Sequence, residues 1–240
     1  MEQLVELSDG TRLWTHVSGK GAPAVFLNGG PGMADYLAPV SALFESSARV
    51  YRFEQRGCGR SDAGGPYTLK RSVADIEELR KYWRVDRWYI VGHSWGVDLG
   101  LAYALGHAES VLGLVGLAGG RIHDDRSWKR IYDERKHEEE QPTAAAGPNL
   151  QVNRALNADW KRYCKEPALL RSLATLEVPA LFLYGENDIR PSWPTEQLCQ
   201  LMPTARFPRI ADADHHLWQG NSDALRRQVI EFLSEHGAGT

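Results

Sequence analysis

Residues Trp88–Gly96, Trp-Tyr-Ile-Val-Gly-His-Ser-Trp-Gly, carry the clearest structural signal of this chain. An apolar run typical of a buried strand leads into a Gly-x-Ser-x-Gly turn, and a helical segment follows at once. This is the order of a sharp strand-turn-helix elbow that exposes a serine as a nucleophile. A plain structural turn is the alternative, because serine and glycine are common in loops. The flanking strand and helix favour a nucleophilic Ser94.

Strands and helices alternate on both sides of this elbow. The hydrophobic pattern predicts strands over residues 4–7, 11–17, 24–27, 49–53, 88–91, 111–117, 180–184 and 205–210. Helical spacing covers residues 36–46, 68–84, 97–105, 194–202 and 222–235. Several strands are apolar throughout, which is typical of a parallel sheet covered on both faces. We therefore predict an α/β protein with a mostly parallel eight-stranded sheet and helices on both faces.

The alternation stops between residues 121 and 165. This segment is rich in charge, contains Trp128 and Trp160, and has an alanine-rich linker between Pro142 and Pro148. Two or three amphipathic helices inserted over the sheet would explain such a pattern. We predict one core domain, residues 1–120 and 166–240, with residues 121–165 as a short helical cap.

Composition and charge give no indication of a nucleic-acid or membrane partner. The 240 residues are 42% hydrophobic and 25% charged, with a net charge of −3, which is ordinary for a soluble domain. No apolar run approaches the ~18 residues of a membrane-spanning helix, and the N-terminus lacks the pattern of a secretory signal. The three cysteines Cys58, Cys164 and Cys199 are widely spaced and suggest no metal site. We expect a cytoplasmic protein without metal or cofactor, and the oligomeric state stays open.

A serine nucleophile needs an imidazole to take its proton and an acid to orient that imidazole. After an elbow of this kind the acid comes first and the histidine second, each in a loop that follows a strand. Asp188 and His215 both follow predicted strands in that order, so they are the expected partners of Ser94. Glu186 is the alternative acid, and His216 is the alternative base.

The segment Asn28–Gly32, Asn-Gly-Gly-Pro-Gly, follows the third predicted strand and should lie beside the elbow. Its glycines allow backbone N–H groups to approach a substrate closely. The N–H groups of Gly30 and Trp95 are the predicted donors to an oxyanion. A phosphate-binding loop is the alternative, but neither GxxxxGK[ST] nor GxGxxG occurs. His93 is predicted to pack beneath the elbow.

Three motifs resemble the α/β-hydrolase superfamily and, within it, the proline iminopeptidase family. Asn28–Gly32 resembles that family's His-Gly-Gly-Pro-Gly, and Gly92–Gly96 resembles its Gly-Gly-Ser-Trp-Gly. Glu54–Ser61 resembles Asp-Gln-Arg-Gly-Cys-Gly-Arg-Ser. The likeness is clear over residues 24–117 and returns weakly over residues 180–233.

The resemblance implies an α/β-hydrolase fold with a catalytic triad and an oxyanion hole. By this likeness Ser94, Asp188 and His215 form the triad, and the N–H groups of Gly30 and Trp95 form the oxyanion hole. It implies no metal or cofactor.

Asp98 departs from the family pattern, because a small or hydroxylated residue is usual at that place in the elbow helix. It could pair with Arg56 or another cation, or it could favour the helix N-terminus.

The predicted cap is shorter than that of proline iminopeptidases, in which cap glutamates bind the free amino terminus of the substrate. The corresponding candidates here are Glu134, Glu138, Glu139 and Glu140, although such a charge run is usually a solvated helix face. Apolar side chains could also bind a substrate, and the candidates are Trp128, Trp160 and Trp218, although aromatic residues are more often part of a core.

These features support three hypotheses about function. The first is a serine hydrolase that cleaves an ester, lactone or amide of a small molecule through an acyl-enzyme on Ser94. The second is an aminopeptidase of the proline iminopeptidase type, with a short peptide as substrate. The third is a non-hydrolytic member of the fold, such as a binding protein, lyase or cyclase.

Overall fold

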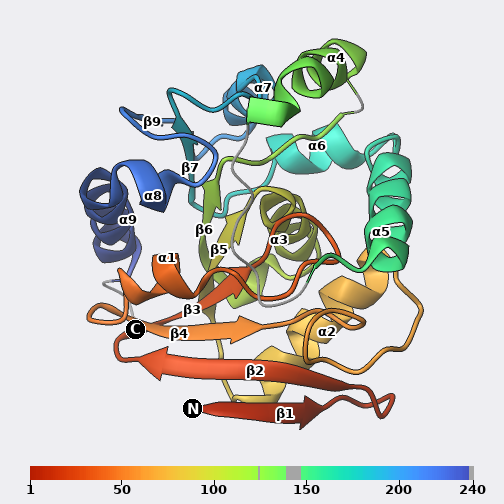
Figure 1. Cartoon of the computed structure of the whole chain (residues 1–240). Coiled ribbons are helices and arrows are strands. Elements are labelled where there is room, and N and C mark those ends of the chain that lie inside the picture. The colour runs from red at the N-terminus through yellow and green to blue at the C-terminus, as the bar shows by residue number, and fades with distance from the viewer. Residues whose placement is uncertain (124, 139–146, 238–240) are drawn as a thin grey trace.

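A nine-stranded sheet forms the centre of the computed structural model (Figure 1), which describes residues 1–123, 125–138 and 147–237. The strands are β1 (Glu2–Glu6), β2 (Arg12–Gly19), β3 (Ala22–Leu27), β4 (Ala48–Phe53), β5 (Trp88–His93), β6 (Val111–Leu117), β7 (Ala180–Gly185), β8 (Ala205–Arg206) and β9 (Arg209–Ile210). Their spatial order is β1-β2-β4-β3-β5-β6-β7-β8, and β9 pairs with the end of β7. Only β1 and β2 run antiparallel to their neighbours, so the predicted mostly parallel sheet is confirmed.

Helices cover both faces of this sheet. They are α1 (Ala38–Ala42), α2 (Leu69–Tyr82), α3 (Trp95–Gly106), α4 (Arg126–Arg135), α5 (Leu150–Tyr163), α6 (Leu169–Ala174), α7 (Trp193–Leu201), α8 (Leu217–Gly220) and α9 (Ser222–His236). Buried side chains of α1, α8 and α9 form a cluster on one face, and those of α2, α3, α5, α6 and α7 form a cluster on the other. The apolar strands predicted from the sequence are thus buried on both sides.

Two local predictions need correction. The single strand expected over residues 205–210 is split into β8 and β9, separated by Phe207 and Pro208. Proline has no N–H to donate to a ladder, so the pairing with β7 is interrupted there. The helix expected over residues 36–46 is limited to the short α1, while the short helices α6 and α8 were not predicted.

The loop after β4 is held by ion pairs with buried carboxylates. The Arg56 guanidinium donates two hydrogen bonds of 2.7 Å to Asp75 on α2, and both side chains are almost fully buried. Glu54, also buried, accepts a hydrogen bond of 2.8 Å from the Arg60 guanidinium. The Glu54–Ser61 segment therefore has a structural role. Arg56 is paired with Asp75, which answers the question of whether it pairs with Asp98.

The segment between residues 121 and 165 contains α4 and α5, which we call the cap helices. These are the helices in its described residues, and both the expected number of cap helices and the division into a core and a cap stay predictions. Figure 1 shows α4 beside α7 and α5 at the edge of the molecule near α2. The predicted linker from Pro142 to Pro148 lies largely outside the described residues.

Helix α5 is attached to the loop between β3 and α1. Asn149, the N-cap residue of α5, donates its backbone N–H to the Gly32 carbonyl at 2.8 Å. Its side-chain amide donates to the Gly57 carbonyl at 2.8 Å. One turn later the Asn153 amide donates to the Pro31 carbonyl at 2.7 Å. The start of this cap helix therefore fixes the glycine-rich loop at the edge of the sheet.

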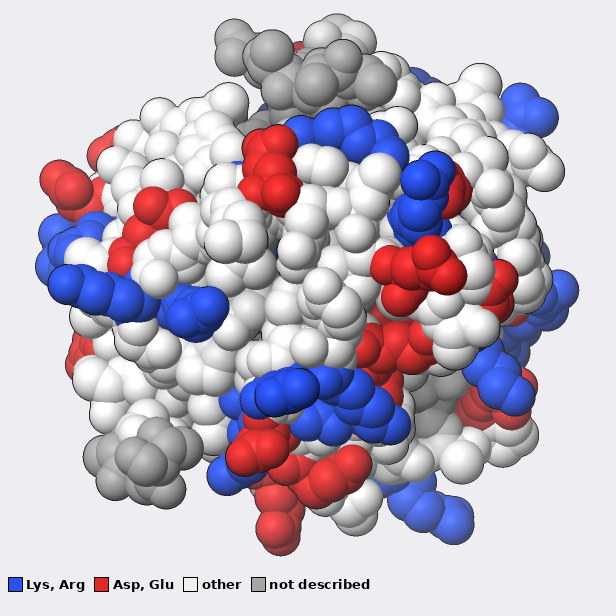
Figure 2. All heavy atoms as spheres, turned by 90° about the horizontal axis from the view of Figure 1, so that it is seen from below, with Lys and Arg blue, Asp and Glu red and all other residues white. Residues whose placement is uncertain are grey.

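Charges of both signs alternate over the face of the molecule seen in Figure 2. Lysines and arginines lie next to aspartates and glutamates there. Across the described ranges, no helix has both the length and the apolar character needed to cross a membrane.

Candidate active site

The parallel strands carry the predicted site residues to one edge of the sheet. The loops after β3, β5, β7 and β9 all follow the carboxyl ends of parallel strands, which meet at the same edge. These loops contain Asn28–Gly32, Ser94, Asp188 and His215. Residues as far apart in the chain as Asn28 and His215 are therefore brought to one edge by the topology of the sheet.

Ser94 occupies a strained elbow between β5 and α3. Its φ and ψ angles are 53° and −122°, a conformation that residues with a side chain rarely adopt. The two flanking glycines allow the close approach of the chain on either side. A Cβ at Gly92 would lie 2.5 Å from the Gly96 carbonyl oxygen, and one at Gly96 would lie 2.0 Å from that of Leu27. The Gly-x-Ser-x-Gly pattern is thus a steric requirement of this turn.

Asp188 and His215 form a buried hydrogen-bonded pair. His215 Nδ1 lies 2.8 Å from Asp188 Oδ2, and the side chains are 5% and 0% exposed. The other carboxylate oxygen accepts the backbone N–H of Arg190 at 2.8 Å. The two loops are joined directly, because the Asn187 N–H donates to the Ala213 carbonyl at 2.9 Å. The geometry can hold the imidazole in one orientation.

Burial sets the protonation of this pair near neutral pH. Desolvation, with Arg190 and His216 nearby, lowers the pKa of His215 well below its ordinary value. Desolvation also raises the pKa of Asp188 to about 6, against the opposing effect of Arg190. At pH 7 the imidazole is therefore neutral and the carboxylate is mostly ionised. A neutral imidazole that donates Nδ1–H to Asp188 keeps Nε2 as a proton acceptor.

The alternatives for acid and base lie elsewhere. Glu186 is exposed, whereas Asp188 contacts the imidazole. His216 is buried among aromatic rings and packs edge-on against Trp218, with ring centroids 5.3 Å apart. Asp214 accepts the backbone N–H of His216 at 2.8 Å, which is the role of a loop acid.

His93 packs beneath the elbow and links it to the histidine loop. Its Nε2 lies 3.0 Å from the His215 carbonyl oxygen, which can only accept, so Nε2 carries the proton. Burial lowers the pKa of His93 well below its ordinary value, so the ring is neutral and Nδ1 is an acceptor. The Tyr36 hydroxyl, 2.6 Å away, donates to that nitrogen and accepts the Gly29 N–H at 2.8 Å. This chain of hydrogen bonds connects the glycine-rich loop to the His215 loop.

The glycine-rich loop presents a backbone N–H beside Ser94. A Cβ at Gly29 would lie 2.7 Å from Ser94 Cβ, so the loop and the elbow are in direct contact. The N–H of Gly29 is used by Tyr36, and Gly30 follows with φ of 45°. Trp95 is the first residue of α3, where backbone N–H groups have no partner within the helix. The Gly30 and Trp95 N–H groups can therefore both serve an oxyanion at Ser94.

A cavity of about 600 Å³ opens onto Ser94. Gly30, Ser94 and Trp95 line it from the edge of the sheet, and the cap helices supply further walls. The cap side chains are those of Trp128, Lys129, Tyr132 and Asp133 on α4 and of Asn153, Asn157 and Lys161 on α5. This volume is large enough for a small organic molecule.

The structure separates the three predicted substrate-binding tryptophans. Trp128 lines the cavity, but Trp160 and Trp218 do not. Trp160 is buried in the core, where its indole N–H donates to the Arg121 carbonyl at 3.0 Å. Trp218 stacks on Tyr36, with ring centroids 6.5 Å apart. These two side chains pack within the protein and lie outside the cavity, as is usual for large aromatic residues.

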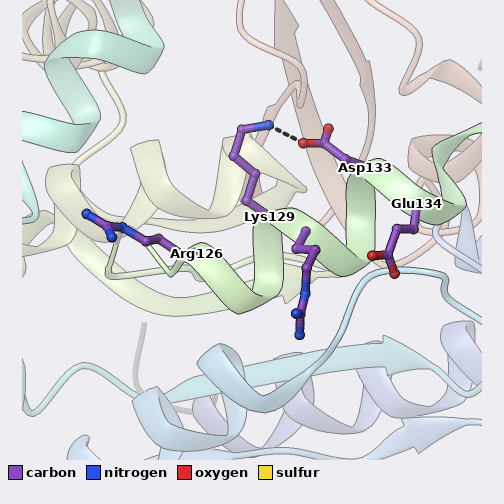
Figure 3. A pocket seen from close by; sticks show the side chains of 5 residues that line it. Arg126, Lys129, Asp133 and Glu134 are labelled. Carbon is purple, nitrogen blue, oxygen red and sulfur yellow. Dashed lines mark hydrogen bonds and ion pairs between the residues drawn. The ribbon is translucent and has the colours of Figure 1, made fainter.

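Of the candidate cap glutamates, the two that the structure describes do not line the cavity. Glu138 pairs with Arg135. Glu134 faces a different depression on α4, of about 450 Å³, in which Lys129 and Asp133 form an ion pair (Figure 3). Glu139 and Glu140 lie outside the described residues.

Several cavity residues were missed or left open by sequence reasoning. Asp98 is buried four residues after Ser94, and it accepts the Arg121 N–H at 3.0 Å. Desolvation raises the pKa of Asp98 to about 7. Arg121 and Arg190 also line the cavity. The two arginines come from segments that are distant in the sequence. The only sequence signal for a nearby cation was Asp98, a carboxylate at an unusual place in the elbow helix.

In the part of the chain that the structure describes, no cluster of three or more His, Cys, Asp or Glu side chains has the arrangement of a metal site.

Comparison with known proteins places this geometry in a family. A family model described as the alpha/beta hydrolase fold matches residues 23–166. A probable proline iminopeptidase from Leptolyngbya boryana is 40% identical over 101 residues, which cover 40% of this chain and 30% of that protein. The predicted resemblance is confirmed, and the aligned part spans about a third of the length of this curated relative.

Solved structures show the same fold over nearly the whole chain. An esterase from Thermogutta terrifontis, with malate bound, aligns with a TM-score of 0.79 at 19% identity, covering 98% of this chain and 99% of that chain. A proline iminopeptidase from Mycobacterium smegmatis aligns with a TM-score of 0.76, also at 19% identity, covering 98% of both chains. At this level of identity the likeness concerns the fold alone.

Proposed function

Because the chain belongs to the α/β-hydrolase fold family, we propose that it is a serine hydrolase of a small-molecule ester, lactone or amide. The observation that carries the proposal is the buried Asp188–His215 pair at the sheet edge that also bears the strained Ser94. The residues match the roles of nucleophile, base and orienting acid in chain order.

In the proposed reaction, Ser94 Oγ attacks the substrate carbonyl carbon while His215 Nε2 takes the hydroxyl proton. The oxyanion receives hydrogen bonds from the N–H groups of Gly30 and Trp95. The tetrahedral intermediate then collapses: the bond to the leaving group breaks, and the imidazolium gives its proton to that group. Asp188 stabilises the imidazolium through the 2.8 Å hydrogen bond.

The acyl-enzyme is then hydrolysed by the same groups. A water molecule gives its proton to His215 Nε2 as it attacks the acyl carbon. The second tetrahedral intermediate releases a carboxylic acid and returns the proton to Ser94 Oγ. No cofactor is needed in this sequence.

The proposal is tested with the Ser94→Ala variant and short p-nitrophenyl esters. Loss of the nucleophile should lower kcat by at least about 1,000-fold. Ser127→Ala is the control, because Ser127 is exposed on α4 and should leave turnover unchanged. Undiminished turnover in Ser94→Ala would contradict the proposal.

A fluorophosphonate probe gives an independent test. Intact-mass spectrometry should show one adduct in the wild type and none in Ser94→Ala. If neither an adduct nor ester turnover is found, a non-hydrolytic binding protein, lyase or cyclase is the better description.

A second candidate function is release of an N-terminal residue such as proline. The observation in its favour is the 40% identity to a probable proline iminopeptidase over 101 residues. It predicts cleavage of proline naphthylamide and loss of this activity when the amine is acylated. Good esterase activity without naphthylamide cleavage would exclude it. A cytoplasmic location belongs to the same proposal, supported by three free thiols.

A further inference from the structure

Several charged side chains of the described residues line the Ser94 cavity. The cations are Arg121, Lys129, Lys161 and Arg190, and the acids are Asp98 and Asp133. Lys129 forms an ion pair with Asp133, and the Arg190 guanidinium lies 3.6 Å from Asp188 Oδ1. Arg121 lines this partly enclosed space, where charges interact more strongly than in water.

The guanidinium of Arg121 is held over the indole of Trp128. Its Cζ lies 4.2 Å from the ring centroid. The backbone of Arg121 is fixed on both sides, because its N–H donates to Asp98 and its carbonyl accepts from Trp160, each at 3.0 Å. Within the described ranges, the guanidinium makes no hydrogen bond or ion pair with the protein. It therefore presents donors to the cavity in a defined orientation.

A second guanidinium is stacked in the same way. Arg190 Cζ lies 4.7 Å from the ring centroid of Tyr132, and one of its amino groups lies 3.5 Å from the Tyr132 hydroxyl. Trp128 and Tyr132, one helical turn apart on α4, stack on one another with centroids 5.4 Å apart. Two arginines from the loops after β6 and β7 thus rest on one aromatic pair of α4. We call these four side chains the arginine–aromatic wall.

Asp98 does not form an ion pair with the Arg121 guanidinium. One of its carboxylate oxygens accepts the backbone N–H of Arg121 rather than the guanidinium. Burial raises the pKa of Asp98 to about 7, so a substantial fraction is uncharged at neutral pH. The Arg121 guanidinium therefore keeps its positive charge beside the cavity in which a substrate of Ser94 would lie.

We propose that the substrate of this hydrolase carries a carboxylate, which Arg121 binds in the arginine–aromatic wall while Ser94 attacks the ester or amide carbonyl. The inference rests on the proposed function and names its substrate class. A planar guanidinium matches a carboxylate with two parallel hydrogen bonds. The Arg121 guanidinium would also repel the free ammonium group that an aminopeptidase must bind, and no described glutamate lines the cavity to offset it.

The test compares two esters of equal chain length, mono-p-nitrophenyl adipate and its methyl ester. They differ in a single negative charge, and their spontaneous hydrolysis is subtracted. A charged hydrogen bond of ordinary strength should give the acid at least about tenfold higher kcat/KM. The preference should shrink at about 0.5 M NaCl, because salt screens a partly open site.

Arg121→Gln should lower kcat/KM for the acid about tenfold more than for the methyl ester. Arg126→Gln is the matched control: it removes an exposed arginine of α4 that lies outside the Ser94 cavity, and it should leave both rates unchanged. Thermal unfolding of each variant checks that the fold is retained. If both esters are cleaved equally well, or the methyl ester better, the carboxylate proposal is wrong while the proposed function stands.

A binding measurement separates the two proposals further. Adipate should raise the Tm of the Ser94→Ala protein, and the shift should be absent in Ser94→Ala/Arg121→Gln. If neither ester is cleaved, the proposed function fails, and this shift alone decides whether the wall binds a carboxylate. Absence of the shift in Ser94→Ala would overturn the anion site.

Discussion

At the scale of single residues, the hydroxyl of Tyr36 links two loops by hydrogen bonds beneath the elbow. It accepts from the Gly29 N–H and donates to His93 Nδ1, and His93 in turn donates to the His215 carbonyl. It therefore spans the loop that bears the predicted oxyanion donor and the loop that bears the predicted base. Its removal leaves a buried donor and a buried acceptor without a partner.

We expect Tyr36→Phe to lower the free energy of unfolding by about 1–3 kcal/mol, the usual cost of unsatisfied buried polar groups. Urea denaturation measures this change, and kcat/KM for a neutral ester should fall as the Gly30 loop loses a support. Tyr82→Phe is the control, because Tyr82 is 54% exposed. An unchanged unfolding free energy in Tyr36→Phe would show that the chain of hydrogen bonds is not structural.

Asp98 should make stability depend on pH. Its pKa is about 7 in the folded protein and near 3.8 when unfolded, so the folded state holds this proton more tightly. The contribution of Asp98 to the free energy of unfolding is therefore fully present below about pH 4 and is lost as the pH rises through 7. As the pH rises from 5 to 8, the free energy of unfolding of Asp98→Asn should increase relative to that of the wild type. The increase should be up to a few kcal/mol, which corresponds to the size of the pKa shift. Denaturant curves at both pH values measure this difference, and a constant difference would refute it.

At the scale of elements, the two cap helices differ in how they are held. Helix α5 buries Val152, Leu156 and Trp160, whereas α4 has no buried residue. Contacts at the start of α4 are mainly polar: the Trp128 indole donates to the Pro191 carbonyl at 3.0 Å, and the Trp193 indole donates to the N-cap residue Asp125 at 2.8 Å. Because burial of apolar surface contributes more to local stability than exposed polar contacts do, α5 should be the more stable of the two helices.

Backbone amides of α4 should therefore exchange with deuterium faster than those of α5 at pH 7. Hydrogen-exchange mass spectrometry on the wild type resolves the two segments. The internal reference is α3, which is buried over most of its length and should exchange most slowly. Equal protection of α4 and α5 would contradict the expectation.

Most elements could be predicted because their patterns are local. The elbow strand, the Thr68-capped helix α2 and the hairpin of β1 and β2 follow from periodicity, capping and turn residues. The division of the last strand depends on the single residue Pro208, and helices as short as α8 leave no periodic signal. The arginine–aromatic wall could not be predicted, since Arg121 and Arg190 meet α4 only through the tertiary fold.

At the scale of the whole molecule, the predicted nucleophile comes from the first half of the chain, and its partners come from the second. Parallel pairing of β5, β6 and β7 joins the halves into one sheet. The pH dependence of activity should therefore be set by the coupled titration of the buried pair Asp188–His215, which joins two loops of the second half of the chain.

The acid limb of kcat/KM should have an apparent pKa at or below about 6. Burial keeps His215 neutral as the pH falls, and activity is lost when the pair takes up a proton and Nδ1–H loses its anionic acceptor. Initial rates on a neutral p-nitrophenyl ester between pH 5 and pH 8 give this value. An acid limb centred above pH 7 would contradict the assignment.

The attachment of α5 to the glycine-rich loop has a consequence for how such enzymes diversify. A cap that only covered the cavity could be replaced by that of a relative to obtain a new specificity. Here Asn149 and Asn153 donate hydrogen bonds to the carbonyls of Gly32 and Pro31, the two central residues of the turn that begins at Gly30. A chimaera in which residues 147–165 are exchanged would therefore have a new cavity wall and also a displaced Gly30 loop, which bears the predicted oxyanion donor. Such an exchange would change substrate selectivity and reaction rate at the same time.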